Sequence, residues 1–212
     1  MITLHIEVPY ASFRKSYARA LAETYPFPPP STIYGMLLSL IGERFRVRHS
    51  GVNLAFAFAK QPRIARTLQR MSGEKYGVSR TPDFIETLCG IEFLCWVDSS
   101  KELNNGRSLE DRLFEAIETP EKVNRTGVVC LGLSDNAVND ISLIKDFGKV
   151  KDFAEAWHWL TPQDDGQIEL PVWVDHVGAY HTRWRRYHFD ASPTSITPDP
   201  PTSQFTEIVD PR

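Results

Sequence analysis

Apolar and polar side chains alternate along residues 2–8, which are rich in β-branched residues, and this pattern predicts a first strand. From residue 33 the apolar positions recur at helical spacing, which predicts an amphipathic helix. Ser31 or Thr32 is expected as its N-cap and Gly42 as its C-terminal stop. The apolar face of this helix consists of Ile33, Met36, Leu37, Leu40 and Ile41.

Apolar runs further along the chain predict strands at residues 52–59, 88–97 and 126–133. Between the last two, a second helix begins after Ser108 and ends at Pro120. Asp111 stands at its capping-box position, and its apolar face consists of Leu109, Leu113, Phe114 and Ile117. The resulting order of elements is the split β-α-β, ferredoxin-like plan on which RNA-recognition folds are built. We therefore expect an α+β fold.

The other segments depart from this plan. Residues 60–87 are basic and weakly periodic, so we expect a long excursion outside the core. A third helix is predicted at 151–160 and a strand at 168–177, whereas the prolines after residue 190 favour a loosely ordered tail. The expected division is a ferredoxin-like domain at 1–145, a C-terminal helix and strands at 146–190, and a proline-rich flexible tail at 191–212.

Charge is distributed unevenly along the chain. The 24 Lys and Arg and 27 Asp and Glu give a formal net charge of −3, which at face value argues against a nucleic-acid partner. However, residues 44–80 hold nine basic residues and a single acidic one, Glu74. Such asymmetry is a hint of a polyanion partner, and a solvated surface is the alternative.

Several classes of function find no support in the sequence. No apolar run is long enough to span a bilayer, and the first ten residues lack the pattern of a signal peptide, so we expect a cytoplasmic protein without membrane contact. The three cysteines, Cys89, Cys95 and Cys130, lack metal-type spacing and are expected as buried thiols in a reducing compartment. No phosphate-binding loop, paired-histidine zinc motif or nucleophile elbow is present, so neither a cofactor nor a metal is expected.

The proline-rich approach to the first helix is a candidate anion site. Pro26 and Pro28 to Pro30 hold the chain extended before Ser31 and Thr32, and the amides of a helix start favour an anion. Gly35, one turn further on, leaves room for a close backbone approach. The alternative is an ordinary capped helix preceded by proline.

The block TYPFPPPSTIYGMLLSLIGE at residues 24–43 resembles the signature of the CRISPR-associated protein 5 family. An early strand and an arginine-containing loop precede the block, as they do in that family. Residues 126–141 are similar to the family's later Leu-Gly-Arg segment, although Leu133 and Ser134 stand where its arginine is usual. The block is most like the type I-B and related myxobacterial or cyanobacterial branches, some of which belong to transposon-associated systems.

The resemblance implies a noncatalytic subunit of a type I Cascade, the RNA-guided surveillance complex. Its fold would be an RNA-recognition-like (RAMP) domain with a long β-hairpin insertion, the thumb, and a short β-rich C-terminal part. Such a subunit caps the 5′ handle of the guide crRNA, and its thumb kinks the first guide segment. The implied partners are crRNA, a backbone subunit of the CRISPR-associated protein 7 family, a large subunit of the protein 8 family and, through the complex, double-stranded target DNA.

The same resemblance assigns candidate RNA-binding residues in two groups. The handle pocket would comprise Arg14, Lys15, Tyr17, Arg19, Ser31, Thr32 and Tyr34. The thumb would contribute Lys60, Arg63, Arg66, Arg70, Lys75, Tyr76 and Arg80, with the cations on sugar-phosphate and the tyrosine on a base. Independently of the resemblance, Arg44, Arg46 and Arg48 alternate with apolar residues, so in an extended segment they share one face. That face would contact RNA or acidic neighbours in the complex.

The aromatic and basic run at residues 176–189 has three interpretations. As a strand it places Tyr180, Thr182, Trp184, Arg186 and His188 on one side. Either the run binds single-stranded RNA through Tyr180, Arg183, Arg185 and Arg186, or its aromatic rings cover the core. The third interpretation is catalytic: some relatives cleave repeat RNA without metal, and the candidate acid and base groups for such an endoribonuclease are His176, Tyr180, His181 and His188. A protein that binds only an acidic protein partner is a further alternative.

Overall fold

The computed structural model describes the chain except for residues 17, 19–20, 73–80, 104–105 and 178, and except for the side chains of residues 69–72 and 81. Tyr17, Arg19, Lys75, Tyr76 and Arg80 of the predicted RNA-binding set therefore lie outside the described residues. None of the helices in the described part is both long and apolar enough to cross a membrane.

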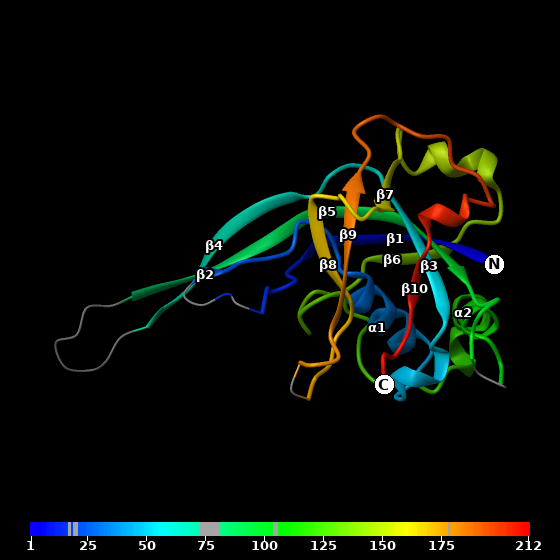
Figure 1. Cartoon of the computed structure of the whole chain (residues 1–212), viewed down its shortest axis with the longest axis horizontal. Helices are drawn as coiled ribbons and strands as arrows, with labels where there is room; N and C mark the ends of the chain where they lie inside the picture. The colour runs from blue at the N-terminus through cyan, green and yellow to red at the C-terminus, as the bar shows by residue number, and fades with distance from the viewer. Residues whose placement is uncertain (17, 19–20, 73–80, 104–105, 178) are drawn as a thin grey trace.

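Four strands and two helices form the centre of the molecule (Figure 1). They are β1 (Ile2–Ala11), α1 (Pro30–Leu40), β3 (Val52–Phe58), β5 (Thr81–Asp98), α2 (Leu109–Glu118) and β6 (Asp140–Leu143). The strands lie in the order β6-β1-β5-β3, and every neighbouring pair among them is antiparallel. The fold is therefore α+β with an antiparallel sheet, and the order of its elements follows the plan expected from the sequence.

The strand predicted at 126–133 is wrong, and β6 takes its place as the last strand of this plan. Cys130 makes only an isolated bridge to Ala137. Gly127 and Gly132 adopt φ values of 82° and 98°, which a strand does not accommodate. This apolar segment forms a loop instead.

The sheet continues beyond β3 through the C-terminal part of the chain. Its strands are β7 (His158–Pro162), β9 (Arg183–Phe189) and β8 (Ile168–Trp173), in that order from β3, and β10 (Thr206–Ile208), which also pairs with β3. Short 3-10 helices lie between strands, at η1 (Arg46–His49), η2 (Pro120–Lys122), η3 (Phe147–Asp152) and η4 (Thr202–Gln204).

Two expectations for this region are wrong. The helix predicted at 151–160 is replaced by the end of η3 and by β7, because Trp157 and Trp159 bury themselves at strand rather than helix spacing. The tail after residue 190 is not uniformly loose, because Thr206 and Ile208 are buried in a strand that pairs with β3.

Both faces of the central sheet are covered. On one face, α1 and α2 pack over alternate side chains of β1, β3 and β5, and β8 and β9 add Trp173 and Tyr187 to the same core. On the other face, Ala55, Ala57 and Trp96 pack against Val150, Trp157 and Trp159. β3 is buried on both faces, which explains its continuous apolar run. Of the three cysteines, only Cys95 is buried, and Cys89 and Cys130 are partly exposed.

The basic excursion forms a hairpin between β4 (Arg63–Ser72) and the first half of β5. Within the described part of the chain β4 pairs with β5 alone, and the short β2 (Leu21–Ala22) pairs with the same part of β5 in parallel. Figure 1 shows this hairpin extending away from the rest of the molecule. Its exposed apolar side chains include Ile64, Leu68 and Phe84.

The two helices differ in how they begin. Ser108 caps α2 by accepting a hydrogen bond from the Asp111 N–H, as predicted, although Phe114 on its expected apolar face is exposed. The N-cap of α1 is Pro29 rather than Ser31 or Thr32, and no side chain caps it. Pro29 holds the chain extended before the helix, and Pro30 fixes the φ of the first helical residue. The helix therefore begins before Ser31 and Thr32.

Candidate nucleic-acid interface

A cavity of about 510 Å³ opens beside the first turn of α1. Its walls come from four segments far apart in the sequence: the loop after β1, the start of α1, the loop before β6 and the connection from β8 to β9. We call this cavity the α1 groove. Its lining includes Arg14, Ser31, Thr32, Gly132, Leu133 and Trp184.

The start of α1 contributes fewer free amides than the sequence suggests. Pro30 has no N–H, and the N–H groups of Thr32 and Ile33 both donate to the Pro29 carbonyl, at 2.9 and 3.0 Å. The Ser31 hydroxyl donates to the Pro171 carbonyl at 2.8 Å and so ties the helix to β8. The first turn of α1 therefore acts mainly as a rigid polar wall.

The loop after β1 places one predicted cation at the groove. Arg14 is exposed, lines the groove, and donates to the Ala18 carbonyl at 3.1 Å. Lys15 lies beside it and forms an ion pair with Glu23 at 3.3 Å. The backbone of this loop is held by a bridge between Arg14 and Thr24. Among the described cations predicted for the handle pocket, Arg14 is thus the one that lines the groove.

The loop before β6 forms the opposite wall and is fixed by a buried amide. The Asn136 side-chain oxygen accepts hydrogen bonds from the Ser12 N–H at 2.9 Å and the Leu133 N–H at 3.1 Å. Gly132 lies so close to the residue that follows β1 that an added Cβ would be 2.7 Å from the Ser12 carbonyl oxygen. Asn136 and Gly132 were not predicted as site residues, because their roles depend on a contact between segments more than 100 residues apart.

β9 contributes an aromatic ring and several exposed cations. Trp184 lines the groove, is 43% exposed, and lies 6.1 Å from the Tyr25 ring. Arg183, Arg185 and Arg186 are exposed along the same strand. Tyr180 is 91% exposed and lies before the strand begins. It therefore does not belong to the strand face that was predicted to carry Tyr180, Thr182, Trp184, Arg186 and His188.

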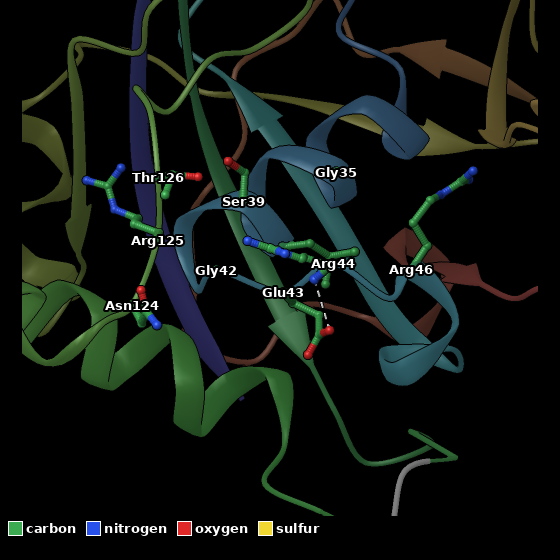
Figure 2. A pocket seen from close by; sticks show the side chains of 10 residues that line it. Gly35, Ser39, Gly42, Glu43, Arg44, Arg46, Asn124, Arg125 and Thr126 are labelled. Carbon is green, nitrogen blue, oxygen red and sulfur yellow. Dashed lines mark hydrogen bonds between the residues drawn. The ribbon is translucent and has the colours of Figure 1, made fainter.

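A second cavity, of about 650 Å³, lies along the other end of α1 (Figure 2). We call it the arginine groove, because Arg44, Arg46 and Arg125 line it together with Gly35 and Ser39. A smaller cavity between the two grooves shares Ser31, Thr32 and Gly132 with the first and Gly35 and Arg46 with the second. The exposed side of α1 therefore borders three neighbouring cavities that share lining residues.

The arginines that follow α1 do not share one face of an extended segment, because residues 46–49 form the 3-10 helix η1. Arg44 is exposed, whereas Arg46 is half-buried with its guanidinium 4.4 Å from the centre of the Trp173 ring. Burial lowers the pKa of Arg46. Tyr34, predicted in the handle pocket, is buried in the core instead, and its hydroxyl donates to the Arg46 carbonyl at 2.6 Å.

Arg48 belongs to an ion-pair network beneath the grooves. Its guanidinium lies 2.7 Å from the Glu43 carboxylate, which Arg112 of α2 also contacts at 2.6 Å. Burial acts to raise the pKa of Glu43, but the hydrogen bonds from Arg112 and the Phe45 N–H and the charge of Arg48 outweigh it and lower the pKa to about 2. The carboxylate is therefore ionised and neutralised from within the protein.

The hairpin carries the described cations of the predicted thumb set. Lys60, Arg63 and Arg66 are exposed, and Arg66 forms an ion pair with Glu86 of the opposing strand at 2.9 Å. The hydrogen bond from Arg66 lowers the pKa of Glu86. Arg70 lies opposite Asp83 in the strand register. Cations on a projecting two-stranded ribbon are suited to contacts with a phosphate backbone.

Comparison with known proteins places this chain. The family model described as CRISPR-associated protein (Cas_Cas5) matches residues 1–74. The chain is 39% identical over 191 residues to CRISPR-associated protein Cas5 of Myxococcus xanthus (strain DK1622), and the match covers 87% of each protein. The chain belongs to the Cas5 family.

Solved structures support the fold of this Cas5-family chain. One, titled "CRISPR RNA-guided surveillance complex", superposes with a TM-score of 0.53 at 14% identity, over 96% of this chain and 95% of the other. Another, titled "Crystal structure of Cas protein", gives a TM-score of 0.52 at 12% identity, over 91% and 94% of the two chains. At such identities the likeness concerns the fold alone.

The candidate acid and base groups of the catalytic alternative lie within β9 and in the segment before it. Within the described residues, no hydrogen bond joins any two of His176, Tyr180, His181 and His188. The nearest ionic partner of His188 is Asp190 at 3.8 Å, while the backbone of His181 bonds to Asp175 at 3.3 Å. Neither contact joins one candidate group to another.

Proposed function

We propose that this Cas5-family chain is a noncatalytic subunit of a type I CRISPR surveillance complex, Cascade, and binds the 5′ handle of the guide crRNA in the α1 groove. Support comes from its family, from the fold it shares with a chain of an RNA-guided surveillance complex, and from the composition of the groove. In this proposal the ferredoxin-like arrangement is an RNA-recognition-like (RAMP) domain whose inserted hairpin acts as the thumb.

The observation that carries the proposal is the combination of groups at the α1 groove. Arg14 offers a cation for phosphate, the first turn of α1 offers polar groups, and Trp184 offers a partly exposed ring. Single-stranded RNA is recognised by this combination, because cations follow its backbone while unpaired bases stack on aromatic rings. A base stacked on Trp184 would contribute about 1–3 kcal/mol.

The hairpin extends this interface. We propose that Lys60, Arg63, Arg66 and Arg70 contact the sugar-phosphate where the first guide segment begins, and that the exposed Ile64, Leu68 and Phe84 support the kink there. Phosphate contacts of this kind position RNA without reading its sequence. Arg183, Arg185 and Arg186, exposed on β9, are further candidates for backbone contacts.

The proposal includes the surroundings of the subunit. Its partners would be the crRNA, a backbone subunit of the Cas7 family, a large subunit of the Cas8 family and, through the complex, target DNA, in the cytoplasm. The identity to the Myxococcus xanthus protein supports a place in the myxobacterial-like branch. The neighbouring genes test that place, since a processing nuclease or transposition genes beside this one would separate defence from RNA-guided transposition.

Binding of repeat RNA to the full chain tests the proposal. We expect fluorescence anisotropy to show that Trp184→Ala and Arg14→Gln each weaken binding, Trp184→Ala by about 5- to 150-fold, as loss of one stacked base implies. Arg107→Gln, which removes an exposed cation from the α2 region, is the control and should leave affinity unchanged. Wild-type affinity in both groove variants would refute the proposed site.

Two further experiments test the other parts of the proposal. Reversing Arg63, Arg66 and Arg70 to Glu should reduce guide-RNA loading in the reconstituted complex, and unchanged loading would exclude the thumb assignment. Incubation of the purified chain with repeat RNA in a chelator should leave the RNA intact. Specific cleavage that His181→Ala or Tyr180→Phe abolishes would show instead that the chain is an endoribonuclease.

A further inference from the structure

Two of the three arginines of the arginine groove have no carboxylate partner among the described residues. Among the described residues, no carboxylate lies within ion-pair distance of Arg44 or Arg125, although the Arg125 guanidinium donates to the Gly127 carbonyl at 3.1 Å. The one acidic residue in the lining, Glu43, is already paired with Arg48 and Arg112. The groove therefore has uncompensated cations and no free anion of its own.

The floor of the arginine groove permits a close approach. Gly35 and Ser39 lie one turn apart on the exposed side of α1, and a Cβ added at Gly35 would meet no atom within 4 Å. At the end of the helix, Gly42 has a φ of 67°, and a Cβ there would lie 2.4 Å from the Asn124 carbonyl oxygen. This tight packing holds the loop that carries Arg125 against the end of α1.

The shape and chemistry of this groove indicate what it binds. Figure 2 shows the three guanidinium groups spread along the groove rather than directed at one point, which suits a chain of negative charges better than a single anion. Among the described residues that line the groove, none is aromatic and could stack on a base. The polar side chains that complete it, Ser39, Asn124 and Thr126, are suited to hydrogen bonds with phosphate and sugar oxygens.

We propose that the arginine groove is a second, sequence-independent subsite, which binds the sugar-phosphate backbone of single-stranded RNA running on from the α1 groove. The shared residues of the cavity between the grooves provide the path along α1. Arg44 and Arg125 are its main phosphate ligands, and Arg46, held against Trp173, lines the junction. This inference rests on the proposed function, because it continues the same RNA.

The salt dependence of RNA binding tests the subsite. For single-stranded nucleic acid, the slope of log affinity against log salt changes by about 0.7 for each phosphate contact. The double variant Arg44→Gln/Arg125→Gln of the full chain should therefore bind repeat RNA with a slope about 1.4 shallower. The double variant Arg44→Lys/Arg125→Lys should keep the wild-type slope, since it keeps both charges.

A matched control removes two other exposed cations. Arg107 and Lys145 pair with Glu115 and Glu118 of α2, outside the groove, and Arg107→Gln/Lys145→Gln should leave the slope unchanged. A slope unchanged in Arg44→Gln/Arg125→Gln would overturn the subsite. If Arg14→Gln and Trp184→Ala still weaken binding in that case, the proposed function stands without the subsite, whereas loss of both effects would refute both.

A photo-crosslinker identifies the occupant directly. With p-benzoylphenylalanine in place of the exposed Ser39, irradiation of the assembled complex should attach the guide RNA to this chain. The same group in place of Ser100, in the turn that follows β5, should give no RNA adduct. Crosslinks from position 39 to a protein subunit alone would show that the arginines meet an acidic protein surface, and would overturn the proposal.

Discussion

Asn136 holds the loop that forms one wall of the α1 groove. Its side chain is 4% exposed, and its oxygen accepts hydrogen bonds from the N–H groups of Ser12 and Leu133 at 2.9 and 3.1 Å. Asn136→Ala removes this acceptor and leaves two donors without a partner. Each donor left unsatisfied and buried costs about 1–3 kcal/mol.

The Ser12 N–H is buried and the Leu133 N–H is nearer the surface, so the expected loss is about 2–4 kcal/mol. For a chain of this size, that corresponds to a decrease in melting temperature of roughly 4–16 °C. Urea unfolding followed by circular dichroism measures the free energy. Amide hydrogen exchange shows where the loss occurs, and the Ser12 and Leu133 amides should exchange faster than in the wild type.

Asn139→Ala provides the matched control, because Asn139 is exposed in the same segment and is held there by its backbone N–H. Its substitution should change the free energy of unfolding by less than about 0.5 kcal/mol. The reasoning is refuted if Asn136→Ala is as stable as Asn139→Ala and the two amides keep their protection. In that case the loop would be held by other contacts.

Three further predictions concern stability and reactivity. Gly42→Ala should destabilise the protein by at least about 1–2 kcal/mol in urea unfolding, because Gly42 has a positive φ and lies against the Asn124 carbonyl. Gly35→Ala, on the open surface of the helix, should instead stabilise the protein by about 0.5–1 kcal/mol. Equal effects of the two substitutions would contradict this account. The pKa of Glu43 falls from 4.5 to about 2 on folding, so its ionisation stabilises the fold above pH 4.5. The wild type should therefore be more stable than Glu43→Gln at neutral pH, and this difference in the free energy of unfolding should decline as the pH falls toward 2. A difference independent of pH would count against the network. Burial raises the pKa of the Cys95 thiol and shields this thiol from solvent. Ellman's reagent should therefore modify Cys89 and Cys130 of the native protein before Cys95. Modification of all three at the same rate would disprove the burial of Cys95.

Short-range patterns in the sequence predicted much of the central sheet. β1, β3 and the second half of β5 follow from runs of apolar and β-branched residues, and α1 and α2 follow from helical spacing and, for α2, the Ser108 cap. In each of these elements the pattern that can be read locally is also the one that the core requires. The basic composition of residues 60–87 likewise placed the hairpin outside the core.

The errors lie where neighbours distant in sequence decide the structure. The run at 126–133 has strand-like composition, but Gly132 is needed to pack against Ser12, so the segment forms a loop. Trp157 and Trp159 fit a helix or a strand equally well until Ala57 of β3 offers one of them a partner in the sheet. β10 is only three residues long and is defined by its pairing with β3.

The candidate site could be predicted only in part for the same reason. The block at residues 24–43 indicated the start of α1, and Arg14 was predicted to bind RNA. Trp184 was placed only within the aromatic and basic run, where its ring could equally cover the core. The meeting of these two residues in one groove depends on the contacts of Asn136 and of Ser31 with Pro171, which no local pattern shows. Tyr34 was placed in the pocket by its position in the motif, yet it points into the core because it lies on the buried side of α1.

Ultraviolet crosslinking of the assembled complex to its guide RNA, followed by mass spectrometry, tests the central claim most directly. The account predicts that the 5′ handle becomes attached to the peptide that carries Trp184, the partly exposed ring of the α1 groove. Handle adducts confined to other surfaces of this chain, or to other subunits, would contradict it.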